Sequence, residues 1–185
     1  MVNTQDIRRV LATILDPEMP INLVDLGIIE AVRVVGLTDE TLAAEIDVTP
    51  TFVGCPALAM IEREIKLRVG ELPGVEQVTV KFVHSPPWTV DRITTPGRDA
   101  LRRFGVTVPD HGTTGTCGTD LAAGATGMNP GGALIPLTIS KPISVACPFC
   151  GAAGTELESP FGPTRCKMIY YCPACRNSFE HLKRV

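Results

Sequence analysis

Four cysteines near the C-terminus have the spacing of a metal site. They form two Cys-x-x-Cys pairs, Cys147 with Cys150 and Cys172 with Cys175. Two thiolates three residues apart in a tight turn converge on one ion, and two such turns complete a tetrahedral shell. A redox dithiol, or iron in the same shell, is a competing interpretation, but paired motifs at this spacing favour zinc. Because four thiolates close the shell, we expect a structural or docking role for this metal.

A fifth cysteine, Cys55, has a position that could make its sulfur reactive. It directly precedes Pro56, a residue suited to the first position of a helix. The exposed N–H groups and positive dipole end of that helix would stabilise a thiolate and lower the pKa of Cys55. Such a sulfur is a nucleophile or a ligand for a soft metal. The alternative is a buried small residue that only fills space.

The sequence alone does not decide the roles of several other polar and aromatic residues. Asp16 and Glu18, in the segment Asp-Pro-Glu-Met-Pro, are either surface charges at a helix end or groups around a metal or thiol. His84 would serve a cysteine hydrolase only within about 3.2 Å of the Cys55 sulfur. Trp88, the single tryptophan, is either a core residue or an exposed anchor for a partner.

The elements that must position these residues follow from hydrophobic periodicity. The first helix is expected over residues 4–15, with an apolar stripe and Asn3 or Thr4 as its cap. Period-two alternation predicts strands, and longer apolar stripes with proline or glycine at their ends predict further helices. The expected elements are a hairpin of strands 28–35 and 42–48, a helix 56–69, a strand around 78–82, and a short helix 97–104 capped by Thr95.

The composition changes sharply in the second half of the chain. Residues 110–141 mix many glycines with Thr, Ala and Pro without any period, which predicts a flexible tether. Residues 142–185 then form the four-cysteine module, with an expected hairpin of strands 155–159 and 167–171. Together with a first domain over residues 1–109, this gives two domains and a linker.

Charge and cysteine usage exclude several classes of protein. The 17 Lys and Arg against 20 Asp and Glu give a net charge of −3, which disfavours a generally basic nucleic-acid binder. No apolar stretch approaches the about 18 residues of a membrane span, and the charged N-terminus is unlike a secretory signal. The seven cysteines cannot all pair internally, and two Cys-x-x-Cys pairs in a chain without a signal indicate metal ligation rather than disulfides. We therefore expect a cytoplasmic protein that binds neither nucleic acid nor a membrane.

Several segments resemble known families when taken together. Residues 16–20, residues 24–28 (Val-Asp-Leu-Gly-Ile) and residues 51–57 (Thr-x-x-Gly-Cys-Pro-Ala) resemble signatures of the SufT-type iron–sulfur assembly domain. Three further segments narrow the resemblance to the PaaD family, accessory subunits encoded with the ring-1,2-phenylacetyl-CoA epoxidase. They are Ser-Pro-Pro-Trp-Thr at 85–89, Gly-Arg at 97–98 and Phe-Gly-x-Thr-x-Cys-Lys at 161–167. The resemblance covers nearly the whole chain outside the glycine-rich segment.

The resemblance implies an α+β fold, with a small three-stranded sheet and two to three helices joined to a C-terminal zinc ribbon with four cysteine ligands. It implies a non-enzymatic maturation factor that delivers an iron–sulfur or diiron centre to the epoxidase system of aerobic phenylacetate degradation. The implied recipients are the oxygenase subunits or the iron–sulfur reductase. Cys55 matches the family's reactive cysteine, and Asp16 and Glu18 match its acidic loop. Cys166 matches an additional ribbon cysteine that has no assigned role.

Three functions remain in competition. A maturation factor would hold a transient Fe ion or Fe–S cluster on Cys55 and, since one thiol binds weakly, would recruit a second ligand. That ligand could come from Asp16, from Cys166 or from the other protomer of a homodimer. A structural adaptor would instead dock the oxygenase subunits, with Cys55 inert. A cysteine-dependent enzyme would need His84 beside Cys55.

Overall fold

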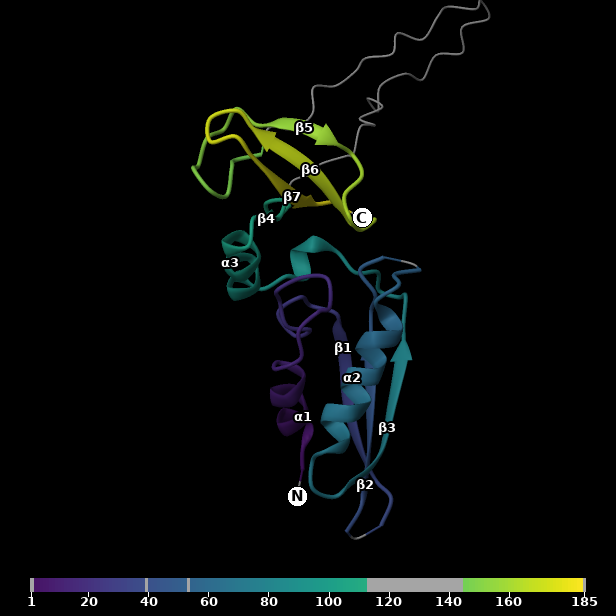
Figure 1. Ribbon diagram of the computed structural model, residues 1–185. Helices are drawn as coiled ribbons and strands as arrows, with labels where there is room; N and C mark the ends of the chain where they lie inside the picture. The colour runs from purple at the N-terminus through teal and green to yellow at the C-terminus, as the bar shows by residue number, and fades with distance from the viewer. Residues whose placement is uncertain (1, 39, 53, 113–144, 185) are drawn as a thin grey trace, which may run out of the picture.

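The computed structural model describes residues 2–38, 40–52, 54–112 and 145–184. Cys117 and the expected tether beyond residue 112 lie outside the described residues. Within the described part, the chain forms a three-stranded sheet and a four-stranded sheet, which lie at opposite ends of the molecule with α3 between them (Figure 1). This confirms the expected fold class of a small α+β domain with a C-terminal ribbon.

The three-stranded sheet has the order β1-β2-β3. Strands β1 (Ile29–Gly36) and β2 (Leu42–Val48) form the expected antiparallel hairpin. Strand β3 (Val75–Phe82) pairs with β2 in parallel, so the chain must cross over between them. Helix α2 (Leu58–Gly70) makes this crossover and packs against β3. The loop that carries Cys55 is therefore the connection from β2 to the crossover helix.

Helix α1 (Thr4–Leu11) packs against α2 and β1. Asn3 caps it as expected, because its side chain accepts hydrogen bonds from the first turn while the Asp6 carboxylate accepts from the Asn3 N–H at 2.9 Å. The expected end at residue 15 was wrong. After Leu11 the backbone leaves the helix, and Leu15 instead forms an antiparallel bridge with Asn22. The acidic segment 16–20 is the turn enclosed by that bridge.

The core of this domain lies between the sheet and the two helices. The expected apolar stripes supply it, with Ile7 and Leu11 from α1, Ile46 from β2 and Ile65 from α2 all fully buried. Trp88 is also buried, and its Nε1–H donates to the Leu26 carbonyl at 2.9 Å. Of the two roles open for Trp88, the structure supports the core residue rather than an exposed anchor.

Two short helical segments follow β3. A 3₁₀ turn, η1 (Val90–Arg92), precedes α3 (Thr95–Arg103). The cap of α3 is Thr94, whose hydroxyl oxygen accepts from the Gly97 N–H at 3.2 Å, so the expected cap at Thr95 was wrong. A Cβ at position 97 would lie 2.7 Å from the Ile21 side chain, which explains the glycine in this close approach.

The second sheet has the order β4-β7-β6-β5. Strands β5 (Glu156–Ser159) and β6 (Lys167–Cys172) form the expected antiparallel hairpin. Two further strands were not expected: β7 (Asn177–Leu182), which pairs with β6, and β4 (Val106–Thr107), which pairs in parallel with β7. Because β4 directly follows α3, the segment that ends the first domain supplies an edge strand to the ribbon sheet.

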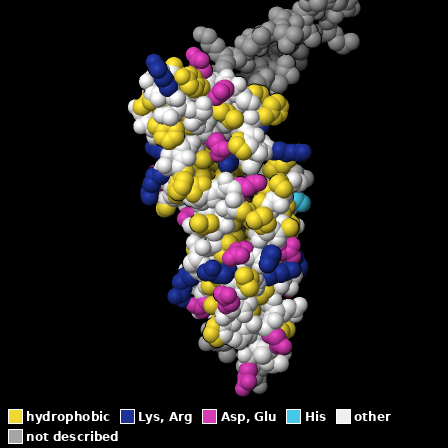
Figure 2. Space-filling view, viewed as in Figure 1, with side chains coloured by type: hydrophobic (Ala, Val, Ile, Leu, Met, Phe, Trp, Pro, Cys, Tyr) yellow, Lys and Arg dark blue, Asp and Glu magenta, His cyan; other side chains and the backbone are white. Residues whose placement is uncertain are grey.

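The two parts share a continuous apolar junction. Val106, Cys166 and Leu182 are buried in the same cluster as the core of the first domain. On the face shown in Figure 2, hydrophobic side chains gather where the ribbon sheet meets the first domain, and charges of both signs are scattered elsewhere. In the part of the chain that the structure describes, no helix is long and apolar enough to span a bilayer.

A buried lysine also joins the two parts. The Lys167 side chain is only 5% exposed, and its Nζ lies 2.8 Å from the Glu180 carboxylate. The same ammonium donates to the backbone carbonyl of Glu18 at 3.2 Å. The acidic turn of the first domain is thus attached to strand β6 of the ribbon.

Candidate functional site

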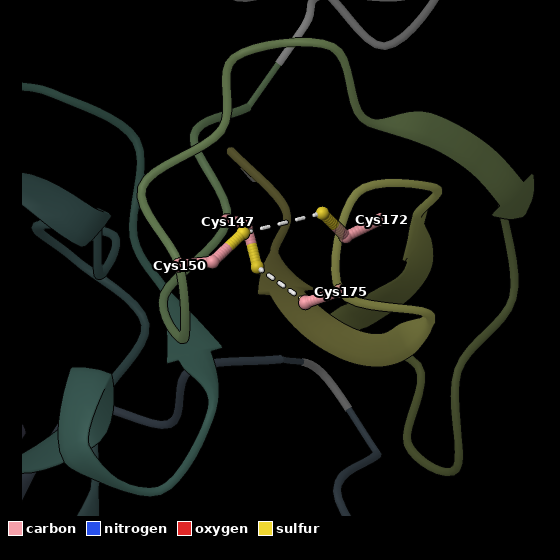
Figure 3. A group of neighbouring side chains, drawn as sticks. All are labelled: Cys147, Cys150, Cys172 and Cys175. Carbon is pink, nitrogen blue, oxygen red and sulfur yellow. Dashed lines mark hydrogen bonds between the residues drawn. The ribbon is translucent and has the colours of Figure 1, made fainter.

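The four C-terminal cysteines converge on one point. Cys147 and Cys150 come from the turn before β5, whereas Cys172 ends β6 and Cys175 lies in the turn to β7 (Figure 3). All four sulfurs lie within 4.8 Å of one another. The Cys147–Cys175 and Cys150–Cys172 sulfur distances are both 3.6 Å. A tetrahedron with metal–sulfur bonds of about 2.3 Å has edges of about 3.8 Å, so the cluster has the dimensions of a zinc site.

Both turns of this cluster have the same backbone geometry. The Gly151 N–H donates to the Cys147 carbonyl at 2.9 Å, and the Arg176 N–H donates to the Cys172 carbonyl at 2.8 Å. Gly151 and Arg176 each have a positive φ, of 76° and 58° respectively. The left-handed conformation after the second cysteine is therefore part of the turn itself, since even a non-glycine residue adopts it.

Hydrogen bonds also favour a thiolate at one of these four cysteines. The side-chain amide of Asn177, helped by its backbone N–H, lowers the pKa of Cys175 to about 6. Zinc binds the thiolate rather than the thiol, so this donor prepares the sulfur for a metal.

A second site is a cavity of about 210 Å³ at the junction between the two parts. The first domain contributes Cys55 and Glu18, and the ribbon contributes Cys166. Two thiols and an acidic residue therefore border one open space. The remaining lining residues are Thr51, Phe52, Gly54, Pro56, Pro163, Thr164 and Arg165.

Cys55 is half-buried in the turn before α2. The helix begins at Leu58 with Ala57 as its cap, so the expected start at Pro56 was wrong and Cys55 lies further from the helix end. Burial raises the pKa of Cys55, the Ala57 N–H opposes this, and the charges of Glu18, Asp16 and Cys166 raise it again. The expected lowering of the Cys55 pKa was therefore wrong.

Cys166 is held in place by its loop. The Cys166 carbonyl accepts from the Lys183 N–H at 2.8 Å, and its sulfur lies 3.1 Å from the Thr164 hydroxyl. The Gly162 N–H donates to the Lys167 carbonyl at 2.9 Å, and a Cβ at position 162 would lie 3.0 Å from the backbone of Lys167. The loop is thus closed by backbone contacts that leave Cys166 at the cavity.

The two acids of the turn have different positions. Glu18 borders the cavity, but Asp16 is not among the lining residues. The Asp16 carboxylate accepts from the Glu18 N–H at 2.9 Å, and its burial raises its pKa. Asp16 therefore shapes the turn that presents Glu18.

His84 is exposed, and no histidine is among the described residues that line the cavity.

The sequence predicted Cys166 only as one of several possible second ligands for a metal held by Cys55. The available signal was the Thr-x-Cys-Lys segment of the ribbon, but nothing in it indicates that Cys166 borders the same cavity as Cys55.

Two family models match the chain. Residues 4–82 match the iron–sulfur cluster assembly protein family, and residues 137–183 match the PaaD zinc beta ribbon domain. The chain is 31% identical over 182 residues to a protein of Escherichia coli (strain K12) named as a 1,2-phenylacetyl-CoA epoxidase subunit, covering 97% of this chain and 92% of that relative. It is also 34% identical over 88 residues to the Fe-S protein maturation auxiliary factor SufT of Staphylococcus aureus (strain USA300), covering 48% of this chain and 96% of SufT.

Among solved structures, a domain of unknown function (DUF59) from Bacillus anthracis aligns with a TM-score of 0.48 and 27% identity, covering 53% of this chain and 90% of that chain. The full-length relative, the assembly-domain match and the ribbon match agree with the order of the two parts in the structure. The chain belongs to the PaaD family, with an iron–sulfur assembly domain followed by a PaaD zinc ribbon.

Proposed function

We propose that this protein is a maturation factor that holds iron or an iron–sulfur cluster transiently on Cys55 and delivers it to a partner. The observation that carries the proposal is the half-buried Cys55 thiol at the open cavity that Glu18 also borders. Thiolates are ligands that iron–sulfur chemistry prefers, and an open cavity leaves room for cargo to enter and leave. The relatives named as Fe-S maturation auxiliary factors support the same function.

The protonation of Cys55 fits a carrier. Iron must displace the thiol proton to bind, and the raised pKa of Cys55 strengthens this competition. Competition with a proton weakens the hold on the metal and favours its release. A stored cofactor would be better served by a preformed thiolate.

We further propose that the recipient is the phenylacetyl-CoA epoxidase system, either its oxygenase subunits or its iron–sulfur reductase. This rests on the name of the Escherichia coli relative, which aligns over nearly the whole chain. The four-cysteine cluster is proposed to hold a structural zinc ion through Cys147, Cys150, Cys172 and Cys175. In that role zinc fixes the ribbon fold, and no step of delivery passes through it.

A structural adaptor is the second candidate. Phe149 and Phe161 of the ribbon are 52% and 76% exposed, and exposed aromatic side chains are frequent anchors of protein interfaces. Docking on these residues is compatible with delivery by Cys55. The two functions differ only in whether Cys55 is needed.

The proposed function is tested by reconstituting the zinc-loaded full chain with ferrous iron and sulfide under argon. We expect visible charge-transfer absorption in the wild type and its loss in Cys55→Ser. The matched control is Cys117→Ser, which removes a thiol that we assign to neither site. Unchanged absorption in Cys55→Ser would remove Cys55 from the ligand set.

A further inference from the structure

We propose that Cys55 and Cys166 are two ligands of one metal site, formed across the junction between the assembly domain and the ribbon, with the Glu18 carboxylate at its edge. The inference deepens the proposed function and rests on it, because it names the second thiol of the same carrier. It assigns the ribbon a direct part in holding the cargo. The zinc cluster of the ribbon is a separate site.

The cavity provides the geometric basis. Both cysteines border the same space of about 210 Å³, although they come from different domains. A single water needs only about 10–15 Å³ of such space, so an ion with its remaining waters, or a small cluster, has room between the two thiols.

The donor set indicates the class of cargo. Two sulfurs are a soft donor set, which suits ferrous iron or an iron–sulfur cluster and not magnesium or calcium. The thiol protons leave to solvent when the metal binds. Two protein donors leave two coordination positions open in a tetrahedral shell, so a recipient's ligand can attack the bound metal.

The ribbon also fixes the position of the turn that carries Glu18, which the first domain contributes to the cavity. Lys167, the residue after Cys166, donates to the Glu18 backbone carbonyl at 3.2 Å. Its ammonium is neutralised by Glu180 at 2.8 Å, which allows a lysine to stay 5% exposed. The residue that follows the second thiol therefore fixes the turn that carries the carboxylate. Separation of the ribbon would remove one ligand and free the acidic turn at the edge of the site.

Cobalt(II) is a suitable probe for this site. Its charge-transfer absorption reports the thiolates bound to it, and zinc already in the four-cysteine cluster resists displacement because it binds such sites more tightly than cobalt. We would titrate the zinc-loaded full chain with cobalt under argon and count the sulfur ligands per cobalt by X-ray absorption. The wild type should show two. This measurement needs no substitution in the buried Cys166.

Four variants complete the test. Cys55→Ser and Cys166→Ser should each reduce the sulfur count to one and weaken cobalt binding by about tenfold or more. Glu18→Gln should weaken binding with the sulfur count unchanged, and Cys117→Ser should behave as the wild type. Circular dichroism would establish that each variant is folded.

Distinct results would overturn the inference. One sulfur per cobalt in the wild type, or two that persist in Cys166→Ser, would show that Cys166 is not a ligand. If Cys55→Ser still lost cobalt binding in that case, the proposed carrier function would stand without the second thiol. If the wild type showed no thiolate absorption at all, both the inference and the proposed function would fail.

Discussion

The two thiol sites of this chain have opposite designs. The cluster of Cys147, Cys150, Cys172 and Cys175 brings four sulfurs within 4.8 Å of one another through turns local to the ribbon. The junction cavity joins Cys55 and Cys166, which are far apart in the sequence, around an open space. The first arrangement can close a coordination shell, and the second cannot.

This difference gives the two sites different expected roles: the closed cluster stabilises the ribbon, and the open cavity serves delivery. A closed shell of four thiolates excludes water and substrate, so its binding energy contributes to folding of a module with a small core of its own. An incomplete coordination shell at a domain junction contributes little to folding but can release the metal that it binds. We therefore predict that the two sites respond in opposite ways to substitution.

The largest effect on the fold should come from losing the closed shell. Cys172→Ser, or zinc removal by a chelator, should unfold the ribbon, because binding in such sites supplies on the order of 10 kcal/mol. Hydrogen exchange would show lost protection in β5, β6 and β7 and retained protection in the three-stranded sheet. Cys55→Ser is the comparison variant and should leave protection in both sheets unchanged. A β6 strand that stays protected without metal would contradict the assigned role.

A smaller effect is expected at the ion pair of the junction. Glu180→Gln leaves the Lys167 ammonium buried without its carboxylate, which should lower the free energy of unfolding by about 3 kcal/mol. The control is Asp47→Asn, which breaks a pair with Arg33 that is 43% exposed on the arginine side and should cost under about 1 kcal/mol. Urea denaturation measures both. Equal losses in the free energy of unfolding would show that the junction ion pair contributes no more to stability than a surface ion pair.

A pH effect is expected at the seam where β4 joins the ribbon. Burial lowers the pKa of His181 from 6.5 to about 4, with Asp110 opposing only in part. The unfolded chain takes up this proton near pH 6.5 and the folded chain only near pH 4, so stability falls as pH drops through that window. Between pH 7 and pH 5 the loss should be about 2 kcal/mol.

The matched variant for this prediction is His181→Gln, which removes the titrating ring. Any effect of pH on zinc binding is common to both proteins, so the difference between their pH dependences isolates His181. We would measure urea denaturation of both at pH 7 and pH 5. Parallel behaviour of the two proteins would show that the ring is not held neutral by burial.

The comparison of the two sites also explains what the sequence could predict. The zinc cluster depends on turns of four residues, so the Cys147-x-x-Cys150 and Cys172-x-x-Cys175 motifs are informative by themselves. The hairpins and the apolar stripe of α1 are likewise local. Their periodicity is visible without any knowledge of the tertiary fold.

Features that depend on tertiary contacts were missed or wrong. Strand β4 has two residues and no periodic signal, and only pairing with β7 defines it. The pKa of Cys55 was expected to fall because of a helix end, but burial and nearby negative groups outweigh that contribution. The Cys55–Cys166 cavity could not be predicted, because no local pattern brings a β2–α2 loop to a ribbon loop.

The central claim is that Cys55 delivers iron to the phenylacetyl-CoA epoxidase system, and it is tested most directly by the metal content of the recipient. The oxygenase would be co-expressed with the wild-type chain or with Cys55→Ser, purified under argon and analysed for iron, alongside co-purification of the two proteins. We expect iron-depleted oxygenase with Cys55→Ser although the variant still binds it. Full iron content in the oxygenase matured with Cys55→Ser would contradict delivery by Cys55 and leave the adaptor function.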